Sequence, residues 1–246
     1  MKNDWSNYEA KKFIKKYKKL GFSKDVALRV YTSRLLGKNK ELVLHGGGNT
    51  SVKTRIKDID GKNYEVLCVK GSGWDMADIE PEGLPAVKLE PLLAMKKKKY
   101  LSDEDMVSFQ KRNLINIKSP NPSVETFLHA FLPFKYVDHT HSDAILNLTN
   151  RPGGLNFCKK IFGNKVSIVP YVMPGFMLAK KINEVYSKDS NINCLILMNH
   201  GIFTFGDDAK EAYDLMIKYV SLAERAIKKL KVKKIKQIKD LSTKFD

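Results

Sequence analysis

Two histidines stand one residue apart in the run Val-Asp-His-Thr-His-Ser, and this spacing suits the binding of a metal ion. His139 and His141 follow a short apolar run that begins at Phe134. If this run is a strand, side chains at i and i+2 point to the same face, so both imidazoles project together while Thr140 faces away. Zinc takes about four ligands from His, Cys or carboxylate groups. The rest of the chain must therefore supply the other ligands.

Two further residues are candidates for those ligands. Glu125 lies on the segment that leads into the histidine strand, and His200 follows another apolar run in Met-Asn-His-Gly. A carboxylate that binds zinc and can also swing away as a base suits an enzyme whose metal must receive substrate. Alternatively, Glu125 pairs with His129, since the i, i+4 spacing puts both on one helix face. The neighbouring aromatic residues favour a core or capping role for His129.

Two glycine turns form a second group of residues with a chemical use. The runs Gly46-Gly-Gly-Asn-Thr-Ser and Gly71-Ser-Gly let the backbone approach a ligand closely, and they offer N–H groups and hydroxyls to an anion. Neither run has the Gly-Lys-Ser/Thr ending of a Walker loop or a complete dinucleotide fingerprint. Ordinary tight turns are the alternative interpretation. The sequence does not decide whether His45, just before the first glycines, lines the same cleft.

Helices and strands are mixed along the whole chain, with no linker and no internal repeat. The patterns predict helices at residues 8–20, 23–36, 84–99, 103–115, 124–132, 177–186 and 209–229, and a helical turn at 143–148. They predict strands at 41–45, 49–55, 64–70, 134–137, 166–172, 193–198 and 202–205. The strand that begins at residue 134 continues into the two histidines. We therefore expect one α/β domain spanning residues 1–246, in which 230–246 form a basic C-terminal tail or helix extension.

The composition is that of a soluble globular protein, with 43% hydrophobic residues. No run of about 18 apolar residues occurs and the N-terminus lacks the apolar segment of a signal peptide, so we expect a cytoplasmic protein without membrane contact. Three cysteines sit in apolar runs and suit buried thiols rather than a disulfide framework. They are Cys68, Cys158 and Cys194.

The formal net charge of +17 raises the question of nucleic-acid binding. Only six of the 44 basic residues are arginine, and the lysines are spread over nearly every polar segment. A phosphate-backbone binder more often clusters its charge and uses arginine forks. We therefore expect no nucleic-acid partner and interpret the lysines as solvated surface, with attraction of phosphorylated substrates as a secondary effect.

The order of the motifs resembles the class II aldolase/adducin family from about residue 25 to 229. The similarity is carried by Gly48-Asn49-x-Ser51, Lys70-Gly-Ser-Gly, Pro122-Ser-Val-Glu125, His139-x-His141 and Asn199-His200-Gly201. The sequences of three of these motifs are similar to those in the aldolase part of bifunctional rhamnulose-1-phosphate aldolase/short-chain dehydrogenase proteins. These sequences are Gly-Ser-Gly-Trp-Asp, Pro-Ser-Val-Glu-Thr and Asp-His-Thr-His. No dehydrogenase segment follows Asp246 in this sequence. We accordingly expect only the aldolase half.

This resemblance implies a three-layer α/β/α fold with a central, mainly antiparallel sheet flanked by helices. It implies a homotetramer with active sites at subunit interfaces, and an enzyme that cleaves a ketose 1-phosphate such as rhamnulose 1-phosphate to dihydroxyacetone phosphate and an aldehyde. Zn2+ or another divalent metal stabilises the charge left when the carbon bond breaks, while Glu125 moves protons. The implied metal ligands are Glu125, His139, His141 and His200, and the implied phosphate-binding residues are Asn49, Ser72, Gly73 and Ser123.

Two departures from the family pattern affect the substrate. Val124 stands where related sugar-phosphate aldolases have a second serine, and a lost hydrogen bond to a charged group is worth about 1.5 to 3 kcal/mol. The tyrosine expected as proton donor has no counterpart in the stretch around Phe157, and Tyr171 and Tyr213 belong to other segments. Epimerisation or decarboxylation of a related sugar or sugar acid phosphate is therefore an alternative. A non-catalytic, adducin-like binding module is less favoured, because all four ligand residues are present.

Overall fold

The computed structural model describes residues 1–230, and its centre is a seven-stranded sheet with the strand order β3-β2-β1-β4-β7-β6-β5. Only β5 and β6 pair in parallel, and every other neighbouring pair is antiparallel. The prediction of a central, mainly antiparallel sheet is confirmed. The strands are β1 (Asn49–Lys57), β2 (Asn63–Val69), β3 (Ala86–Lys88), β4 (Tyr136–Thr140), β5 (Val166–Val169), β6 (Cys194–Leu197) and β7 (Gly201–Gly206).

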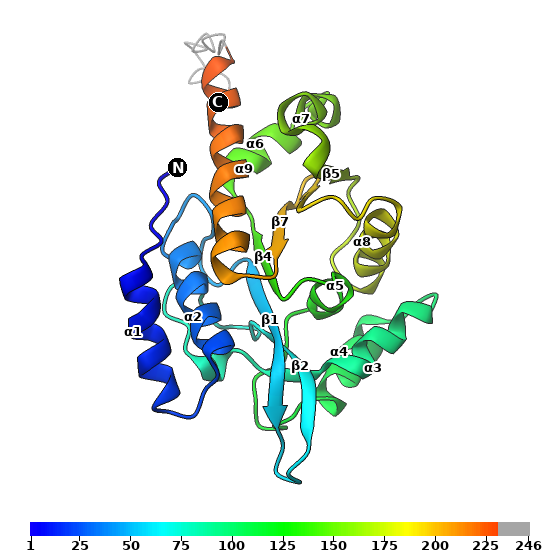
Figure 1. The fold of residues 1–246 in the computed structure, drawn as a ribbon. Coiled ribbons are helices and arrows are strands. Elements are labelled where there is room, and N and C mark those ends of the chain that lie inside the picture. Colours follow the sequence, from blue (N-terminus) through cyan, green and yellow to red (C-terminus); the bar gives the residue numbers. More distant parts are fainter. Residues whose placement is uncertain (231–246) are drawn as a thin grey trace, which may run out of the picture.

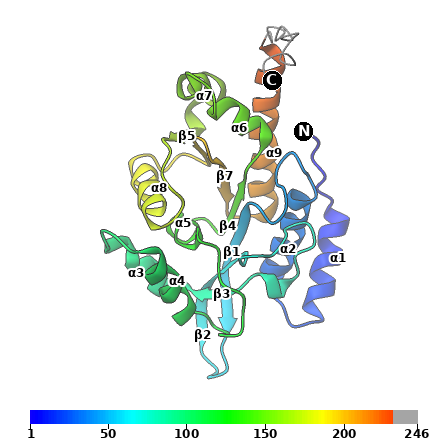
Figure 2. The same ribbon diagram turned by 180° about the vertical axis from the view of Figure 1, so that it is seen from behind.

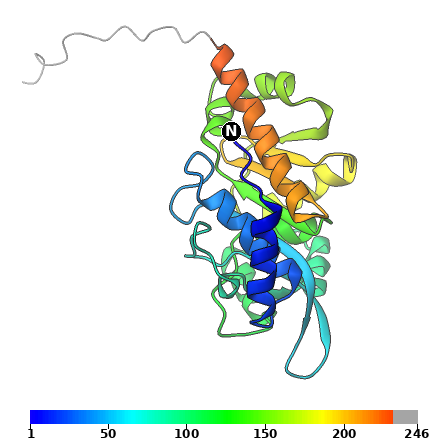
Figure 3. The same ribbon diagram turned by 60° about the vertical axis from the view of Figure 1, so that its left-hand side comes forward.

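Helices cover both faces of the sheet, which confirms the three-layer α/β/α prediction. In Figures 1 and 2, α1, α2 and α9 lie on one side of the sheet and α3, α4, α5 and α8 on the other, while α6 and α7 lie near the upper part of α9. Figure 3 shows α1 and α9 in front of the sheet. The helices are α1 (Asn7–Lys18), α2 (Lys24–Gly37), α3 (Leu89–Ala94), α4 (Asp103–Arg112), α5 (Thr126–Phe131), α6 (Asp143–Thr149), α7 (Gly154–Phe162), α8 (Phe176–Lys188) and α9 (Ala209–Lys229).

Strand β2 is apolar on both faces over its buried half, because its successive residues enter opposite cores. In β2, Leu67 and Val69 join the core beneath α3, α5 and α8, whereas Val66 and Cys68 join the core beneath α1 and α2. Strands covered on both faces are expected to be continuously apolar rather than alternating. This is why β2 and β6 were recognisable as apolar runs. No helix in residues 1–230 is both long and apolar enough to cross a membrane.

Several helices begin at a residue whose side chain caps the first turn. The Ser23 hydroxyl accepts a hydrogen bond from the Val26 amide at 3.2 Å, and the Ser102 hydroxyl accepts one from the Asp105 amide at 3.1 Å. Each bond satisfies one of the amide groups that the first turn of a helix leaves unpaired.

Two predictions of secondary structure are wrong, and one helix was not predicted. The predicted strand at 41–45 is a series of turns, in which Leu42 and Val43 are buried and His45 has a left-handed φ of 41°. It has no strand to pair with, because both edges of β1 are already occupied by β2 and β4. The predicted helix at 84–99 begins instead with β3, and helix α7 was not predicted. Residues 231–246, most of the predicted basic tail, lie outside the described residues.

Candidate metal and substrate site

The two histidines of the His-Thr-His run lie side by side at the end of β4. The Nε2 atoms of His139 and His141 are 2.9 Å apart, while the Thr140 hydroxyl contacts the Met216 sulfur at 3.3 Å beneath α9. The alternation predicted from the strand period is therefore present. His139 is fully buried, and its Nδ1–H donates to the Ile202 carbonyl at 3.0 Å. This bond leaves the Nε2 lone pair of His139 facing His141.

His200 and Glu125 approach the same point from two other segments. His200 sits in the turn between β6 and β7, after Asn199 with its left-handed φ of 58°. Glu125 is the residue just before α5, and its two carboxylate oxygens lie 3.4 Å from His139 Nε2 and 3.5 Å from His200 Nε2. One nitrogen of each of the three histidines lies within 4.8 Å of the others. We call these three histidines and Glu125 the metal set.

The chemistry of the metal set fits a divalent cation. Glu125 Oε1 is buried and has no hydrogen-bond donor within residues 1–230. Burial raises the pKa of Glu125 to about 7, with the hydrogen bond from Asn49 acting in the opposite direction. Burial also lowers the pKa of His139, His141 and His200, the last to about 4, so the imidazoles are neutral near pH 7. Neutral imidazoles beside a carboxylate are the donors that zinc and similar ions bind.

Two glycines allow the chain to pass close to the histidines. Gly48 has a left-handed φ of 61°, and a Cβ there would lie 2.7 Å from the His139 carbonyl oxygen. A Cβ at Gly201 would lie 2.4 Å from the Thr140 carbonyl oxygen. Larger residues would thus push β1 or β7 away from the end of β4. The glycines of the first turn and of Asn-His-Gly therefore serve the packing of the site.

One cavity of about 340 Å³ joins the metal set to both glycine turns. All four predicted phosphate-binding residues line this cavity, together with three of the four residues of the metal set, and the fourth, His139, is buried behind them. The two groups of residues that the sequence singled out separately are thus parts of one site. The lining residues are Gly46, Gly47, Gly48, Asn49, Lys70, Gly71, Ser72, Gly73, Ser123, Val124, Glu125, His141, Pro174 and His200.

The second glycine turn is tied to the segment before Glu125. Gly71 and Pro122 form an isolated antiparallel bridge, and the Ser123 amide donates to the Lys70 carbonyl at 3.1 Å. Ser72 and Gly73 are exposed to the cavity, whereas Ser123 is 8% exposed. This bridge explains how residues about fifty positions apart come to line one wall.

Lys70 is a cavity residue that the sequence reasoning missed. Its Nζ donates to the Gly46 carbonyl at 2.8 Å, so it links the two glycine turns, and burial lowers its pKa. Among the lining residues it is the one lysine or arginine. A lysine directly before a glycine turn with exposed amide and hydroxyl groups was a usable signal, because such turns attract anions.

Most of the other residues considered as site residues from the sequence lie outside the metal set and the cavity. His129 is fully buried and outside the metal set, and it bonds through its two ring nitrogens to Ser51 and Asn49. This agrees with the core interpretation. Neither His45 nor any tyrosine of residues 1–230 is among the cavity-lining residues. Val124, in place of the second serine, lines the cavity and is 48% exposed.

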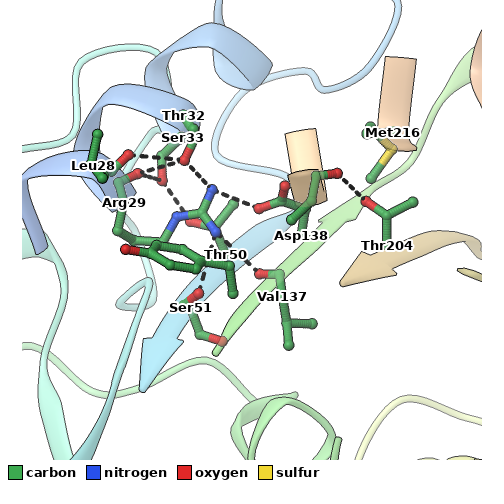
Figure 4. A network of polar contacts seen from close by, with 12 residues as sticks. Leu28, Arg29, Thr32, Ser33, Thr50, Ser51, Val137, Asp138, Thr204 and Met216 are labelled. Atoms are coloured by element: carbon green, nitrogen blue, oxygen red, sulfur yellow. Dashed lines mark hydrogen bonds and ion pairs between the residues drawn. The ribbon is translucent and has the colours of Figure 1, made fainter. Parts of the chain in front are cut away.

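A buried ion pair joins α2 to β4 at the residue before His139 (Figure 4). Arg29 Nη2 is 2.6 Å from the Asp138 carboxylate, and both side chains are fully buried. Arg29 also donates to the carbonyls of Ser51 and Val137, at 3.2 and 3.5 Å. These contacts join α2 to β1 and β4 where Asp138 precedes the first histidine. The sequence reasoning did not single out either residue.

We expect the affinity for Zn2+ to fall about tenfold per pH unit below pH 7 and to level off above it. Burial raises the pKa of Glu125 to about 7, so below that pH one proton must leave before the carboxylate binds a cation. Burial lowers the histidine pKa values, that of His139 well below its usual range and that of His200 to about 4, so the imidazoles compete for protons less than Glu125 does. Competition titrations with a chelator between pH 5.5 and 8 measure the slope. A profile that is flat across this range would contradict the expectation.

The sequence matches the class II aldolase and adducin N-terminal domain family over residues 27–227. It is 39% identical over 204 residues to the uncharacterised oxidoreductase YuxG of Bacillus subtilis, covering 83% of this chain and 30% of that protein. The chain thus spans less than a third of that relative's length.

The fold is similar to those of two solved structures. The N-terminal class II aldolase domain of a conserved Thermoplasma acidophilum protein is 43% identical, with a TM-score of 0.81 over 92% of this chain and 99% of that chain. A sugar-phosphate aldolase from Thermotoga maritima is 18% identical, with a TM-score of 0.60 over 82% of this chain and 93% of that chain. The second likeness is one of fold. Together with the match over residues 27–227, these findings establish that the chain belongs to the class II aldolase and adducin N-terminal domain family.

Proposed function

We propose that this protein is a zinc-dependent aldolase that cleaves a ketose 1-phosphate, such as rhamnulose 1-phosphate, to dihydroxyacetone phosphate and an aldehyde. The observation that carries this proposal is that one cavity joins the metal set to two glycine turns. A cation site alone would suit many hydrolases and binding proteins. A cation site facing a turn with amide, hydroxyl and ammonium groups suits a phosphorylated substrate whose reacting oxygens meet the metal.

In this proposal the four residues of the metal set hold the ion, which as a Lewis acid would neutralise the negative charge that develops on the substrate's oxygens. Glu125 takes the proton from the substrate hydroxyl on the carbon that becomes the aldehyde when the carbon–carbon bond breaks. Its raised pKa matches a base that works near neutral pH. Asn49 donates to Glu125 Oε2 at 2.7 Å and keeps that carboxylate aimed at the histidines.

The opposite wall of the cavity would hold the phosphate. Ser72 and Gly73 present exposed groups there, and Lys70 supplies a positive charge beside them. Ser123 lies further back, because its hydroxyl already accepts from the amides of Asn49 and Glu125 at 3.1 and 3.2 Å. We therefore assign the stronger phosphate contacts to Lys70 and the Gly71–Gly73 turn. Lys70 offsets the hydrogen bond that Val124 cannot make.

The direct test is product formation by the metal-loaded protein. Rhamnulose 1-phosphate and fuculose 1-phosphate are incubated with the zinc-loaded protein, and dihydroxyacetone phosphate is measured by a coupled reduction. We expect release from at least one ketose 1-phosphate, and loss of release after chelation that zinc restores. The same sugars without phosphate should react at least about a hundredfold more slowly, since they lose the charged contacts.

Zinc-bound protein that forms no dihydroxyacetone phosphate from any such ketose would contradict this proposal. Product analysis by NMR then separates the alternatives, because an epimerase returns a sugar phosphate of the same mass and a decarboxylase releases carbon dioxide. The homotetramer with sites at subunit interfaces and the cytoplasmic location stay predictions. So does the single-domain organisation of residues 1–246.

A further inference from the structure

Strand β1 presents a polar face to helix α5, the helix that begins at Glu125. Asn49, Ser51 and Lys53 occupy alternate positions of the strand and therefore point to the same side. Each of them bonds to α5 or to the residues that flank it. Asn49 and Ser51 bond the side chain of His129, while the Lys53 ammonium donates to three carbonyls at the end of the helix, those of His129, Leu132 and Phe134, at 2.7 to 2.8 Å.

The side-chain hydrogen bonds that link Ser51, His129, Asn49 and Glu125 form a series in which each donor points toward the metal set. The Asn49 amide donates to Glu125 Oε2 at 2.7 Å and to the Ser123 hydroxyl at 3.1 Å. Because a carboxylate can only accept, the NH2 group must face Glu125 and the amide oxygen must face His129. His129 Nε2 then donates to that oxygen, and its Nδ1 accepts from the Ser51 hydroxyl at 2.8 Å. We call Ser51, His129 and Asn49 the hydrogen-bond chain.

The hydrogen-bond chain decides which way the Asn49 amide faces. An amide turned by 180° would aim its oxygen at the Glu125 carboxylate, and two acceptors in contact in a buried site repel each other. His129 opposes this turn, because its N–H donor needs the amide oxygen on its own side. The ring has no freedom to shift, since it is fully buried and packs edge-on against Phe203 with centroids 5.6 Å apart.

The start of the hydrogen-bond chain is also fixed. Ser51 carries its hydroxyl toward His129, while its carbonyl accepts from the buried Arg29 that pairs with Asp138 (Figure 4). Its strand neighbour Thr50 points to the other face and bonds the Ser33 hydroxyl at 2.7 Å. A role in packing alone would require neither a hydroxyl at Ser51 nor a donor at His129.

We propose that His129 is a positioning residue of the metal site: through Asn49, it fixes the orientation of the Glu125 carboxylate that the ion requires. This inference rests on the proposed function for the identity of the metal set. It assigns to His129 and Ser51 a role that neither burial nor membership of the core explains. Residues that orient metal ligands from behind typically change metal affinity or activity by about 10- to 100-fold when replaced.

The test compares two replacements of His129 that differ in where they place a polar group. A glutamine side chain reaches the position of Nε2, so His129→Gln keeps a donor for Asn49. An asparagine side chain reaches only the position of Nδ1, so His129→Asn can bond Ser51 but not Asn49. Both variants lose the ring and its contact with Phe203, so the loss of folding stability should be similar in the two.

The readouts are the affinity for Co2+ and Zn2+, the visible absorption spectrum of the Co2+-loaded protein, and kcat and KM separately. For His129→Asn we expect metal affinity about 10- to 100-fold lower, an altered Co2+ spectrum and a lower kcat. For His129→Gln we expect the spectrum of the unmodified protein and an affinity within about threefold of it. Unfolding curves of both variants verify that they are folded under the conditions of the titration.

A smaller change tests the far end of the hydrogen-bond chain without removing the ring. Ser51→Ala deletes the hydroxyl that selects the tautomer of His129, and we expect metal affinity to fall by about three- to tenfold. Ser33→Ala is the matched control. Ser33 is a residue of α2, and its buried hydroxyl bonds Thr50 on the opposite face of β1. That control should leave metal affinity and the Co2+ spectrum unchanged.

The outcomes separate this inference from the proposed function. Unmodified protein that binds neither Co2+ nor Zn2+ overturns both. Metal-binding protein in which His129→Asn matches His129→Gln, and Ser51→Ala matches Ser33→Ala, overturns the positioning role and leaves the proposed function in place. Loss of affinity confined to His129→Asn and Ser51→Ala supports the role. If His129→Asn does not fold, the Ser51→Ala comparison alone decides between these results.

Discussion

Replacement of Glu125 by glutamine should reduce dihydroxyacetone phosphate formation about a thousandfold or more, while the protein stays folded. Glutamine keeps the size of the side chain and can still accept from Asn49, but it loses the charge that faces His139 and His200 at 3.4 and 3.5 Å. The change removes both a proposed metal ligand and the proposed base, and general acid–base catalysis alone contributes about 10²- to 10⁴-fold. Affinity for Zn2+ should fall by more than about a hundredfold, because in the proposed site this carboxylate is a direct ligand of the ion.

The measurements are the zinc content of the purified variant and its kcat with saturating zinc. Glu104→Gln is a suitable control, since Glu104 is an exposed glutamate on α4 away from the cavity. A Glu125→Gln protein that holds zinc and turns over at the normal rate would remove Glu125 from both of its proposed roles. A Glu125→Gln variant that binds zinc but is inactive would support the role of Glu125 as the base and contradict its role as a metal ligand.

Replacement of Arg29 by methionine should lower the free energy of unfolding by about 3 to 5 kcal/mol. Arg29 and Asp138 are fully buried, and the carboxylate has no other hydrogen-bond donor in the described part of the chain. Burial already raises the pKa of Asp138, and Arg29 acts against that rise. Without the guanidinium, the protein must bury an unpaired charge or protonate the carboxyl group. Either outcome costs a large part of the stability of a typical domain.

Urea denaturation followed by circular dichroism measures this loss. Arg55→Met provides the control, because Arg55 also pairs with a carboxylate, that of Glu65 at 3.0 Å, but its side chain is 77% exposed. Exposed ion pairs contribute about 0 to 1 kcal/mol, so that variant should unfold almost normally. Equal losses from the two variants would mean that burial does not govern the energetics of the Arg29 pair.

The parts of the site that were predictable from sequence depend on local geometry. The joint projection of His139 and His141 follows from the two-residue period of a strand, which is independent of the rest of the fold. Glu125 was also identified, although it lies just before α5 rather than within the predicted helix of residues 124–132. The family resemblance supplied the order of the motifs, which no single spacing could provide.

The parts that were missed depend on contacts between distant segments. In the sequence Arg29 looks like an ordinary polar residue of a helix, until β4 brings Asp138 against it. The run at 41–45 has strand-forming residues, but a strand needs a free edge, and β1 has none to offer. Strand β3 is three residues long, too short to display a period in the sequence. Pairing partners of this kind are a property of the whole sheet.

The strand order has a consequence for how the protein would acquire the proposed ion. The cavity wall is made where β1, β4 and β7 lie next to one another, although these strands are far apart along the chain. Pairing them closes long loops, and contacts of this kind form slowly during folding. The growing chain therefore has no preformed site for a cation until its central strands have come together. A cation that binds this site would therefore bind after these strands have paired, and it would stabilise the folded chain over the unfolded one.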